Sequence, residues 1–240
     1  MTTKSIKIAV LIVGEYRTFA QCRRTMTFLN DPKVDVYFST WDTTNTLNPL
    51  INKIGPYAIK PRKVSFEEIQ RALNIPHATI KIHKKPEHND TFLIMREGWF
   101  LGMQMVIDSG KDYDFIYVMR PDLYYENKFV FKDINYNEYE NNIGLLYIPD
   151  ENNNADDTSF FSTYSNIKKL LNTDVLKIHQ TPEEGNLHVV WFKYISDKGF
   201  SFTKMPYSSS YVIGRYPITN NTTWEEAFTQ YWNLFHNRPI

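Results

Sequence analysis

The chain has 240 residues, of which 42% are hydrophobic, 22% charged and 15% aromatic. Lysine plus arginine and aspartate plus glutamate both number 27, so the formal net charge is zero and a broad basic surface for nucleic acid is not expected. The nine glycines form neither G-x-G-x-x-G nor G-x-x-x-x-G-K-[ST]. This argues against P-loop ATPases, kinases with a glycine-rich loop and standard Rossmann dehydrogenases.

The first apolar run, Ile8–Val13, is about a third of the minimum of roughly 17 residues that a membrane span needs. Glu15-Tyr16-Arg17 follows it where a signal peptide would have a small-residue cleavage site. The lone Cys22 fits a reducing compartment. We therefore expect a cytoplasmic protein with no membrane span, whose first apolar run is a buried strand.

Strand and helix patterns alternate along the chain. The predicted strands cover Ile6–Val13, Val34–Ser39, Tyr57–Val64, Asp114–Met119, Gly144–Ile148, Ser159–Ser162, Phe200–Met205 and Tyr211–Gly214. The predicted helices cover Thr18–Leu29, a segment opened by the capping box Ser65–Glu68, a segment from Asp90 to Gly110, Tyr164–Leu171, Asn186–Asp197 and Thr223–Phe235. Residues 75–90 are typical of a loop or short strand. The alternation predicts an α/β fold with a mostly parallel sheet and helices on both faces.

Two further features of the pattern concern packing and loops. Gly98 and Gly102, within the helix that ends near Gly110, are expected to allow close packing of helix on sheet. Residues 135–157 are rich in Asn, Asp, Glu and Tyr, which indicates a surface loop or a lid near a site.

Polar residues follow the predicted strands at the points where ligands bind in open α/β sheets, beyond the carboxyl ends of the strands. These are Gly14–Arg17, Thr40–Asp42, Arg120–Asp122, the Asp156-Asp157 region and Thr181–Glu184. Arg120-Pro121-Asp122 gives the strongest signal. An arginine fork suits a diphosphate, and an aspartate can hold a hard divalent cation that also touches phosphate oxygens. The alternative is a structural ion pair at a strand end.

Three of these segments resemble glycosyltransferases of the GT-A type, and within them the WavE-like transferases of lipopolysaccharide and polysaccharide biosynthesis. The resemblance rests on Gly14-Glu15-Tyr16-Arg17-Thr18-Phe19, Ser39-Thr40-Trp41-Asp42 and Tyr113–Leu123, and it covers roughly residues 6–165. It implies one Rossmann-like GT-A domain over residues 1–240, with a nucleotide-sugar-binding half at 1–125 and an acceptor-side half at 126–240. It also implies a nucleotide-sugar donor and a glycan or related acceptor, with no nucleic acid partner.

The resemblance also implies residue roles. Gly14 and Arg17 would line the nucleotide pocket, Asp42 would contact base or ribose, and Arg120 and Asp122 would occupy the place of the D-x-D motif. Asp157 would orient or deprotonate the acceptor hydroxyl, with Glu183 and Glu184 as weaker candidates for that role.

The sequence departs from the family pattern at two points, and both concern charge. The D-x-D position reads R-P-D, so Asp122 alone supplies a carboxylate for a divalent cation, Mn²⁺ or Mg²⁺. Glu15 stands where the family usually has Gln. A catalytically degenerate GT-A-like domain that binds glycan or nucleotide without turnover is therefore the second hypothesis. A metal-dependent phosphohydrolase or nuclease is a third, disfavoured because the sequence shows no carboxylate cluster of the kind that two-metal sites need.

Overall fold

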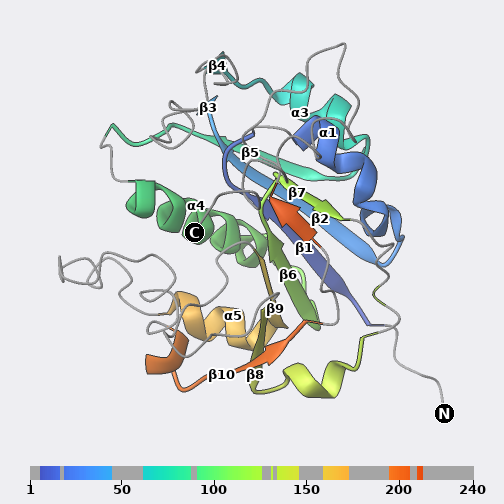
Figure 1. Cartoon of the computed structure of the whole chain (residues 1–240), viewed down its shortest axis with the longest axis vertical. Helices are drawn as coiled ribbons and strands as arrows, with labels where there is room; N and C mark the ends of the chain where they lie inside the picture. Colours follow the sequence, from blue (N-terminus) through green and yellow to red (C-terminus); the bar gives the residue numbers. More distant parts are fainter. Residues whose placement is uncertain are drawn as a thin grey trace, which may run out of the picture.

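The computed structural model describes residues 6–16, 19–44, 62–87, 91–125, 131, 134–145, 159–172, 195–205 and 210–212. Its core is a seven-stranded sheet with the order β10-β8-β9-β6-β1-β2-β5 (Figure 1). The strands are β1 (Ile8–Val13), β2 (Val34–Trp41), β5 (Thr79–His83), β6 (Phe115–Met119), β8 (Asn142–Leu145), β9 (Ser159–Thr163) and β10 (Ser201–Lys204). Only β9 pairs antiparallel with its neighbours in this sheet. The predicted α/β class with a mostly parallel sheet is confirmed.

The central strand β1 is apolar throughout and all six of its residues are buried. It pairs in parallel with β2 on one side, where Ile8 lies beside Val34, and with β6 on the other, where Ile8 lies beside Phe115. A strand covered on both faces needs no alternation of apolar and polar residues, which explains the continuous apolar run.

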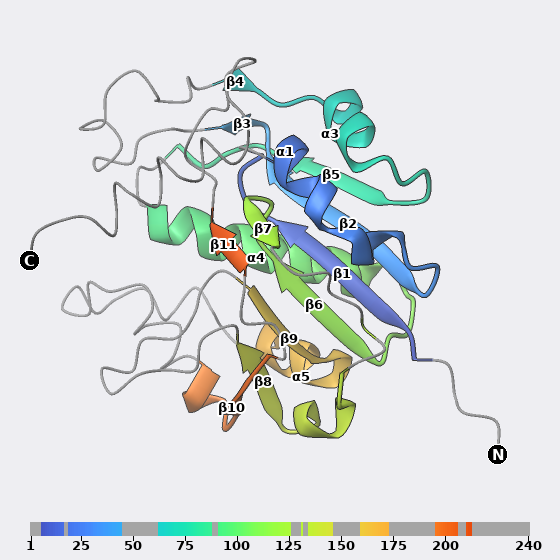
Figure 2. The same ribbon diagram turned by 45° about the vertical axis from the view of Figure 1, so that its right-hand side comes forward.

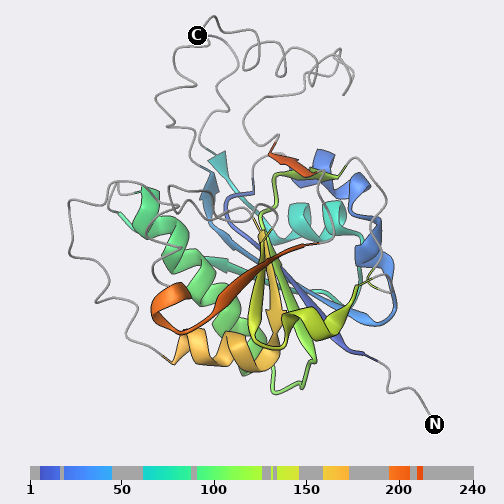
Figure 3. The same ribbon diagram turned by 60° about the horizontal axis from the view of Figure 1, so that its bottom comes forward.

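Helices cover both faces of the sheet, as predicted (Figure 3). Alternate residues of β1 divide the core: Ile8, Val10 and Ile12 pack on the face of α1 (Phe19–Cys22) and α3 (Phe66–Leu73). Ala9, Leu11 and Val13 pack on the face of α4 (Thr91–Asp108) and α5 (Tyr164–Leu171). No helix in the described part of the chain is long and apolar enough to cross a membrane.

The two glycines of α4 lie against the sheet, as predicted. A Cβ at Gly102 would lie 3.1 Å from Leu11 Cδ2, and a Cβ at Gly98 would lie 3.3 Å from Trp41 Cζ2. Side chains at these positions would push the helix away from β1 and β2. Their absence therefore allows α4 to pack closely on the strands that carry the first two motifs.

The predicted helix ends of α3 and α4 are confirmed. Ser65 caps α3, because its Oγ accepts a hydrogen bond of 3.2 Å from the backbone N–H of Glu68. Gly110 follows α4 with φ +67°, a conformation that glycine adopts without strain, and its N–H donates to the carbonyl of Ile107.

One prediction for the amino-terminal half needs correction, and one alternative is decided. The continuous helix expected over 18–29 is wrong: α1 ends at Cys22, and two short 3₁₀ helices, Arg23–Thr25 and Thr27–Asn30, follow it. The break lies at Met26 (φ −87°, ψ 57°), which is not helical. Of the loop or short strand expected within residues 75–90, the structure has the strand, β5, which pairs with β2 from Tyr37 to Trp41. Its residues are partly buried or exposed because it lies at the edge of the sheet.

The described part of the segment expected to be a surface loop or lid, residues 135–145, contains secondary structure. A 3₁₀ helix, Tyr136–Tyr139, and strand β8 lie within it, and Tyr139, Ile143 and Leu145 are buried. Residues 146–158, most of the helix predicted over 186–197 and the helix predicted over 223–235 lie outside the described residues.

Two small antiparallel ribbons accompany the main sheet. The first pairs β3 (Thr43–Thr44) with β4 (Arg62–Lys63), the described part of the strand predicted over 57–64. The second pairs β7 (Leu123–Tyr125) with β11 (Ser210–Val212) and lies on the α1 side of the sheet (Figure 2). Each ribbon begins shortly after a strand of the main sheet ends, β3 after β2 and β7 after β6.

We predict that Gly102→Val destabilises the protein by roughly 1–3 kcal/mol, because the added methyl groups overpack the contact with Leu11 and Val13. Urea unfolding followed by circular dichroism measures the change. The control is Gln104→Val, which places the same β-branched residue on the exposed side of α4. Valine has a higher intrinsic helix propensity than glycine, so an unchanged or increased stability of Gly102→Val would show that the close approach to β1 carries no cost.

Candidate functional site

The chain reverses direction across the sheet at β1, which makes the carboxyl ends of β1 and β6 the natural binding position. From β1 the chain proceeds outward to β2 and β5, and it then returns to place β6 on the other side of β1. All four strands are parallel, so their carboxyl ends meet at one edge. We call the segments after them the carboxyl edge: residues 14–16, 42–44, 84–87 and 120–122. Ligands of open α/β sheets bind at such a reversal.

Gly14 joins the three motifs. Its φ of +133° favours glycine, and a Cβ there would lie 3.2 Å from Cδ of Pro121. Its backbone N–H donates to the carbonyl of Ser39 at 3.2 Å. The turn after β1 therefore contacts both the R-P-D turn after β6 and the end of β2, and the three motifs meet at one place, as their strand-end positions predict.

Arg120 and Asp122 form a bidentate ion pair with each other. Arg120 Nε donates to Asp122 Oδ1 at 2.9 Å, and Nη2 donates to Oδ2 at 2.7 Å. The side chain of Asp122 is 2% exposed and that of Arg120 is 15% exposed. The structural ion pair that the sequence left open is thus present in this conformation, directly beside the Gly14 contact. A phosphate that binds Arg120 through its fork must share it with Asp122 or displace that carboxylate.

The described residues do not by themselves supply the ligands of a divalent cation. No group of three or more His, Cys, Asp or Glu side chains lies together among them. Asp122 contributes one carboxylate, and both of its oxygens already accept hydrogen bonds. A hard cation takes six or more oxygen ligands, so the remainder would have to come from donor phosphates and water.

Two other carboxylates of the carboxyl edge, those of Glu15 and Asp42, are bound by Lys85, a residue that the sequence did not single out. Lys85 Nζ forms an ion pair with Glu15, and each side chain is 11% exposed. The backbone N–H of Lys85 donates to Asp42 Oδ1 at 3.0 Å. The negative charge of Glu15, which departs from the family pattern, is therefore balanced within the protein. Asp42 holds the turn after β5 and keeps only part of its hydrogen-bonding capacity for a ligand.

His83 was also not among the predicted site residues, because it falls in a segment expected to be a loop or short strand. Its Nε2 lies 3.0 Å from the buried Oγ of Ser39, and its ring packs edge-on against Trp41 with centroids 6.0 Å apart. Burial lowers its pKa, and Lys81 lowers it further. This histidine, the last residue of β5, thus connects the S-T-W-D motif at the end of β2 to β5, the outermost strand of the sheet.

Tyr16 anchors the turn after β1 in the core. Its ring is 1% exposed and packs against Phe19 and Phe38, with centroids 5.7 and 6.1 Å away. Burial raises its pKa to about 12, with a smaller contribution from the carboxylate of Glu68, while the guanidinium of Arg62 acts in the opposite direction. The phenol is therefore neutral at physiological pH.

The first half of the third motif lies at the opposite edge of the sheet, where the amino ends of β1, β2 and β6 meet, and its contacts are structural. The hydroxyl of Tyr113 donates to Asp35 Oδ2 at 2.7 Å and lies 2.7 Å from the hydroxyl of Tyr37. The carboxylate of Asp114 accepts a hydrogen bond of 2.9 Å from the backbone N–H of Lys7. These contacts fix the start of β6, so within this motif only Arg120–Asp122 lie at the carboxyl edge.

The structure therefore brings together Gly14, Asp42, Arg120 and Asp122, four of the predicted site residues. Arg17, Asp157, Glu183 and Glu184 lie outside the described residues. Their predicted roles stay predictions.

Comparison with known proteins gives a distant structural likeness. No protein-family profile matches the sequence, and no curated protein matches it. Solved structures that resemble the fold include two crystal structures of the glycosyltransferase GlyE of Streptococcus pneumoniae TIGR4, one of them the apo form. Both have a TM-score of 0.45 and 12% sequence identity, covering 84% and 83% of this chain and 46% of the GlyE chain. The chain thus spans less than half of the GlyE chain, and we draw no residue role from so distant a likeness.

The raised pKa of Tyr16 predicts a pH dependence of stability. The unfolded phenol titrates near pH 10 and the folded one near 12. The stability that this difference provides is complete below about pH 10 and is lost as the pH rises to 12, because the unfolded state releases its proton first. Urea unfolding between pH 9 and 12 should show a shallower decline for Tyr16→Phe, by up to about 1.4 kcal/mol per pH unit. Identical slopes for the variant and the wild type would contradict the assignment to Tyr16.

Proposed function

We propose that the chain is a glycosyltransferase that moves a sugar from a nucleotide-sugar donor to a hydroxyl of a glycan or related acceptor. The observation that carries the proposal is the position of Gly14, which contacts Pro121 and donates to the carbonyl of Ser39, so that three strand-end motifs meet at the reversal of the sheet. Such a reversal is where α/β folds bind nucleotides. The motifs that meet there are those in which the sequence resembles GT-A enzymes.

The chemistry of sugar transfer assigns a task to each group. The leaving nucleoside diphosphate develops negative charge that a cation or an arginine must stabilise, and Arg120 is the proposed donor of those hydrogen bonds. Gly14 and Arg17 are proposed to line the nucleotide pocket, and Asp42 to contact base or ribose. The acceptor hydroxyl needs a carboxylate base or close positioning, for which Asp157 is the first candidate and Glu183 and Glu184 the next.

A divalent cation, Mn²⁺ or Mg²⁺, remains part of the proposal, with Asp122 as its protein ligand and donor phosphates completing the coordination. When bound, such a cation would neutralise charge on the diphosphate. The protein's own contribution would be the Arg120 guanidinium, whose present partner is Asp122.

The second candidate function is nucleotide or glycan binding without turnover by a degenerate GT-A-like domain. The bidentate pairing of Arg120 with Asp122 favours it, because that pairing satisfies both charged groups of the R-P-D motif in the absence of any ligand. The two functions share a binding site and differ in whether the bond to the anomeric carbon is broken.

A donor panel separates these functions. The wild-type chain is incubated with UDP-, GDP-, CMP- and dTDP-sugars, with and without Mn²⁺, and thermal shift and donor hydrolysis are measured. A glycosyltransferase should show stabilisation by one class of nucleotide and slow hydrolysis of its sugar. Stabilisation without hydrolysis would favour the degenerate domain. The absence of binding to every donor would overturn the glycosyltransferase function and the nucleotide-binding form of the second function.

The Asp122→Asn variant is expected to remove the Mn²⁺-dependent part of donor binding while the fold persists, because an amide is a much weaker ligand for a hard cation than a carboxylate. Titration of the donor with and without Mn²⁺ measures this. The control is Asp35→Asn, which alters an ion-paired aspartate, bound to Lys111 at 2.9 Å, at the opposite edge. An unchanged titration for Asp122→Asn would show that Asp122 has only a structural role.

A further inference from the structure

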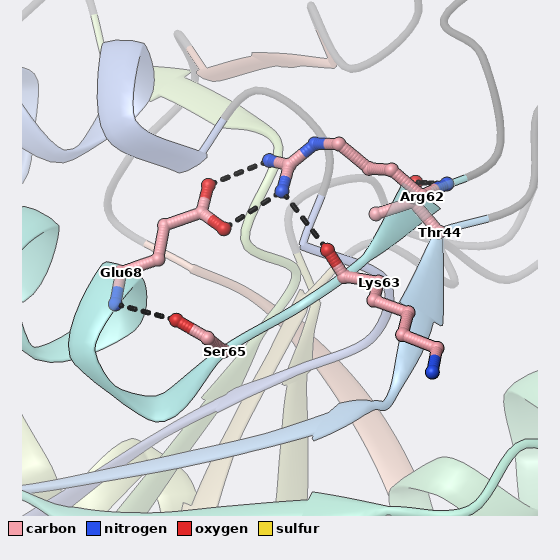
Figure 4. Close-up of polar contacts among 5 residues, drawn as sticks. All are labelled: Thr44, Arg62, Lys63, Ser65 and Glu68. Carbon is pink, nitrogen blue, oxygen red and sulfur yellow. Dashed lines mark hydrogen bonds and ion pairs between the residues drawn. The ribbon is translucent and has the colours of Figure 1, made fainter.

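Arg62 is brought to the carboxyl edge by the β3–β4 ribbon, which follows directly after the S-T-W-D motif. Its backbone N–H donates to Thr44 Oγ1 at 3.3 Å, and its Nη1 donates to the carbonyl of Lys63 at 3.3 Å (Figure 4). Contacts within the ribbon therefore hold both the backbone and the guanidinium of Arg62 in place.

Glu68, in the first turn of α3, fixes the orientation of that guanidinium. Its two carboxylate oxygens accept hydrogen bonds of 2.7 and 2.6 Å from Arg62 Nη1 and Nη2 (Figure 4). The backbone of Glu68 is itself held by the cap to Ser65. A bidentate pair sets the plane of the guanidinium as well as its location, which a single hydrogen bond does not.

The guanidinium also lies over the ring of Tyr16, with its carbon 5.7 Å from the ring centroid. This is within the range of a cation–π interaction. Tyr16 is buried and stands two residues after Gly14, which contacts Pro121. One side chain thus connects the segment after β2, the start of α3 and the turn after β1. We call Arg62, Glu68 and Tyr16 the arginine clamp.

We propose that Arg62 is a positioning residue, which through the arginine clamp fixes the turn Gly14–Tyr16 in the conformation that receives the donor nucleotide. The proposal rests on the proposed function for the nature of the ligand. An ion pair whose side chains are 43% and 34% exposed contributes little to global stability on its own. The clamp's main effect is therefore local, on the geometry of a turn that lies at the reversal of the sheet.

The first test needs no ligand. Amide hydrogen exchange by NMR follows Gly14, whose N–H is protected by its bond to Ser39. In Arg62→Ala this exchange is expected to be about two- to five-fold faster, the ratio that corresponds to a cation–π contact at a partly exposed position. Arg62→Lys should show a smaller increase, since it keeps the charge but loses the fork. The matched control is Lys111→Ala, which removes an exposed ion pair with Asp35 at the opposite edge and should leave Gly14 unchanged.

The second test measures ligand binding. The nucleoside diphosphate among UDP, GDP and dTDP that binds the wild-type chain most tightly is titrated into each variant by calorimetry. Arg62→Ala is expected to weaken binding by about two- to five-fold, by the same argument. Arg62→Lys is expected to recover part of the loss, and Lys111→Ala should bind as the wild type does.

The outcomes are distinguishable. Unchanged exchange at Gly14 in Arg62→Ala, or an equal increase in Lys111→Ala, overturns the clamp. Faster exchange with unchanged affinity overturns the positioning role and leaves a structural contact. No binding of any nucleoside diphosphate to the wild type overturns the proposed function, and the positioning role falls with it, whereas the exchange result still decides whether Arg62 fixes the turn.

Discussion

The parallel pairing of β1 on both of its sides is the constraint on which the rest of the structure depends. Because β2 and β6 flank it in parallel, three motifs that are separated by up to a hundred residues end at the same edge. Burial of β1 on both faces fixes this register, since a shift by one residue would exchange the side chains that face α3 and α4. The site is therefore positioned by apolar residues that never touch a ligand.

Charged side chains at and beside the carboxyl edge are arranged in pairs, one of them within a single turn and two between separate segments. Arg120 pairs with Asp122, Lys85 with Glu15, and Arg62 with Glu68. Each pair joins or stiffens turns that backbone hydrogen bonds alone would leave loosely held. An anionic ligand approaching this edge would meet arginines whose charge is already compensated. Recognition of the proposed donor there would depend on exchange of partners and on geometry more than on a standing positive field.

The sequence predicted the parts of the fold that have a strong local signature. Continuous apolar runs located β1, β2 and β6, and helical spacing with Ser65 and Gly110 located the ends of α3 and α4. The edge strand β5 was harder because its alternating Ile and Lys residues are only partly buried. The β7–β11 ribbon joins segments about 85 residues apart, and no local pattern specifies such a pairing. The strand-end rule found Gly14, Asp42, Arg120 and Asp122, whereas Lys85, His83 and Arg62 act through contacts that only the folded chain creates.

The two glycines on the inner side of α4 have a consequence for how the protein folds. Each interior glycine lowers the intrinsic stability of a helix by about 1 kcal/mol relative to alanine, and most of the stability of a helix in a protein comes from its tertiary packing. Segment 91–108 therefore gains much of its helical structure from docking onto β1 and β2. Helix and sheet then form as one cooperative unit, so that the strands carrying the first two motifs and the helix that supports them become ordered together.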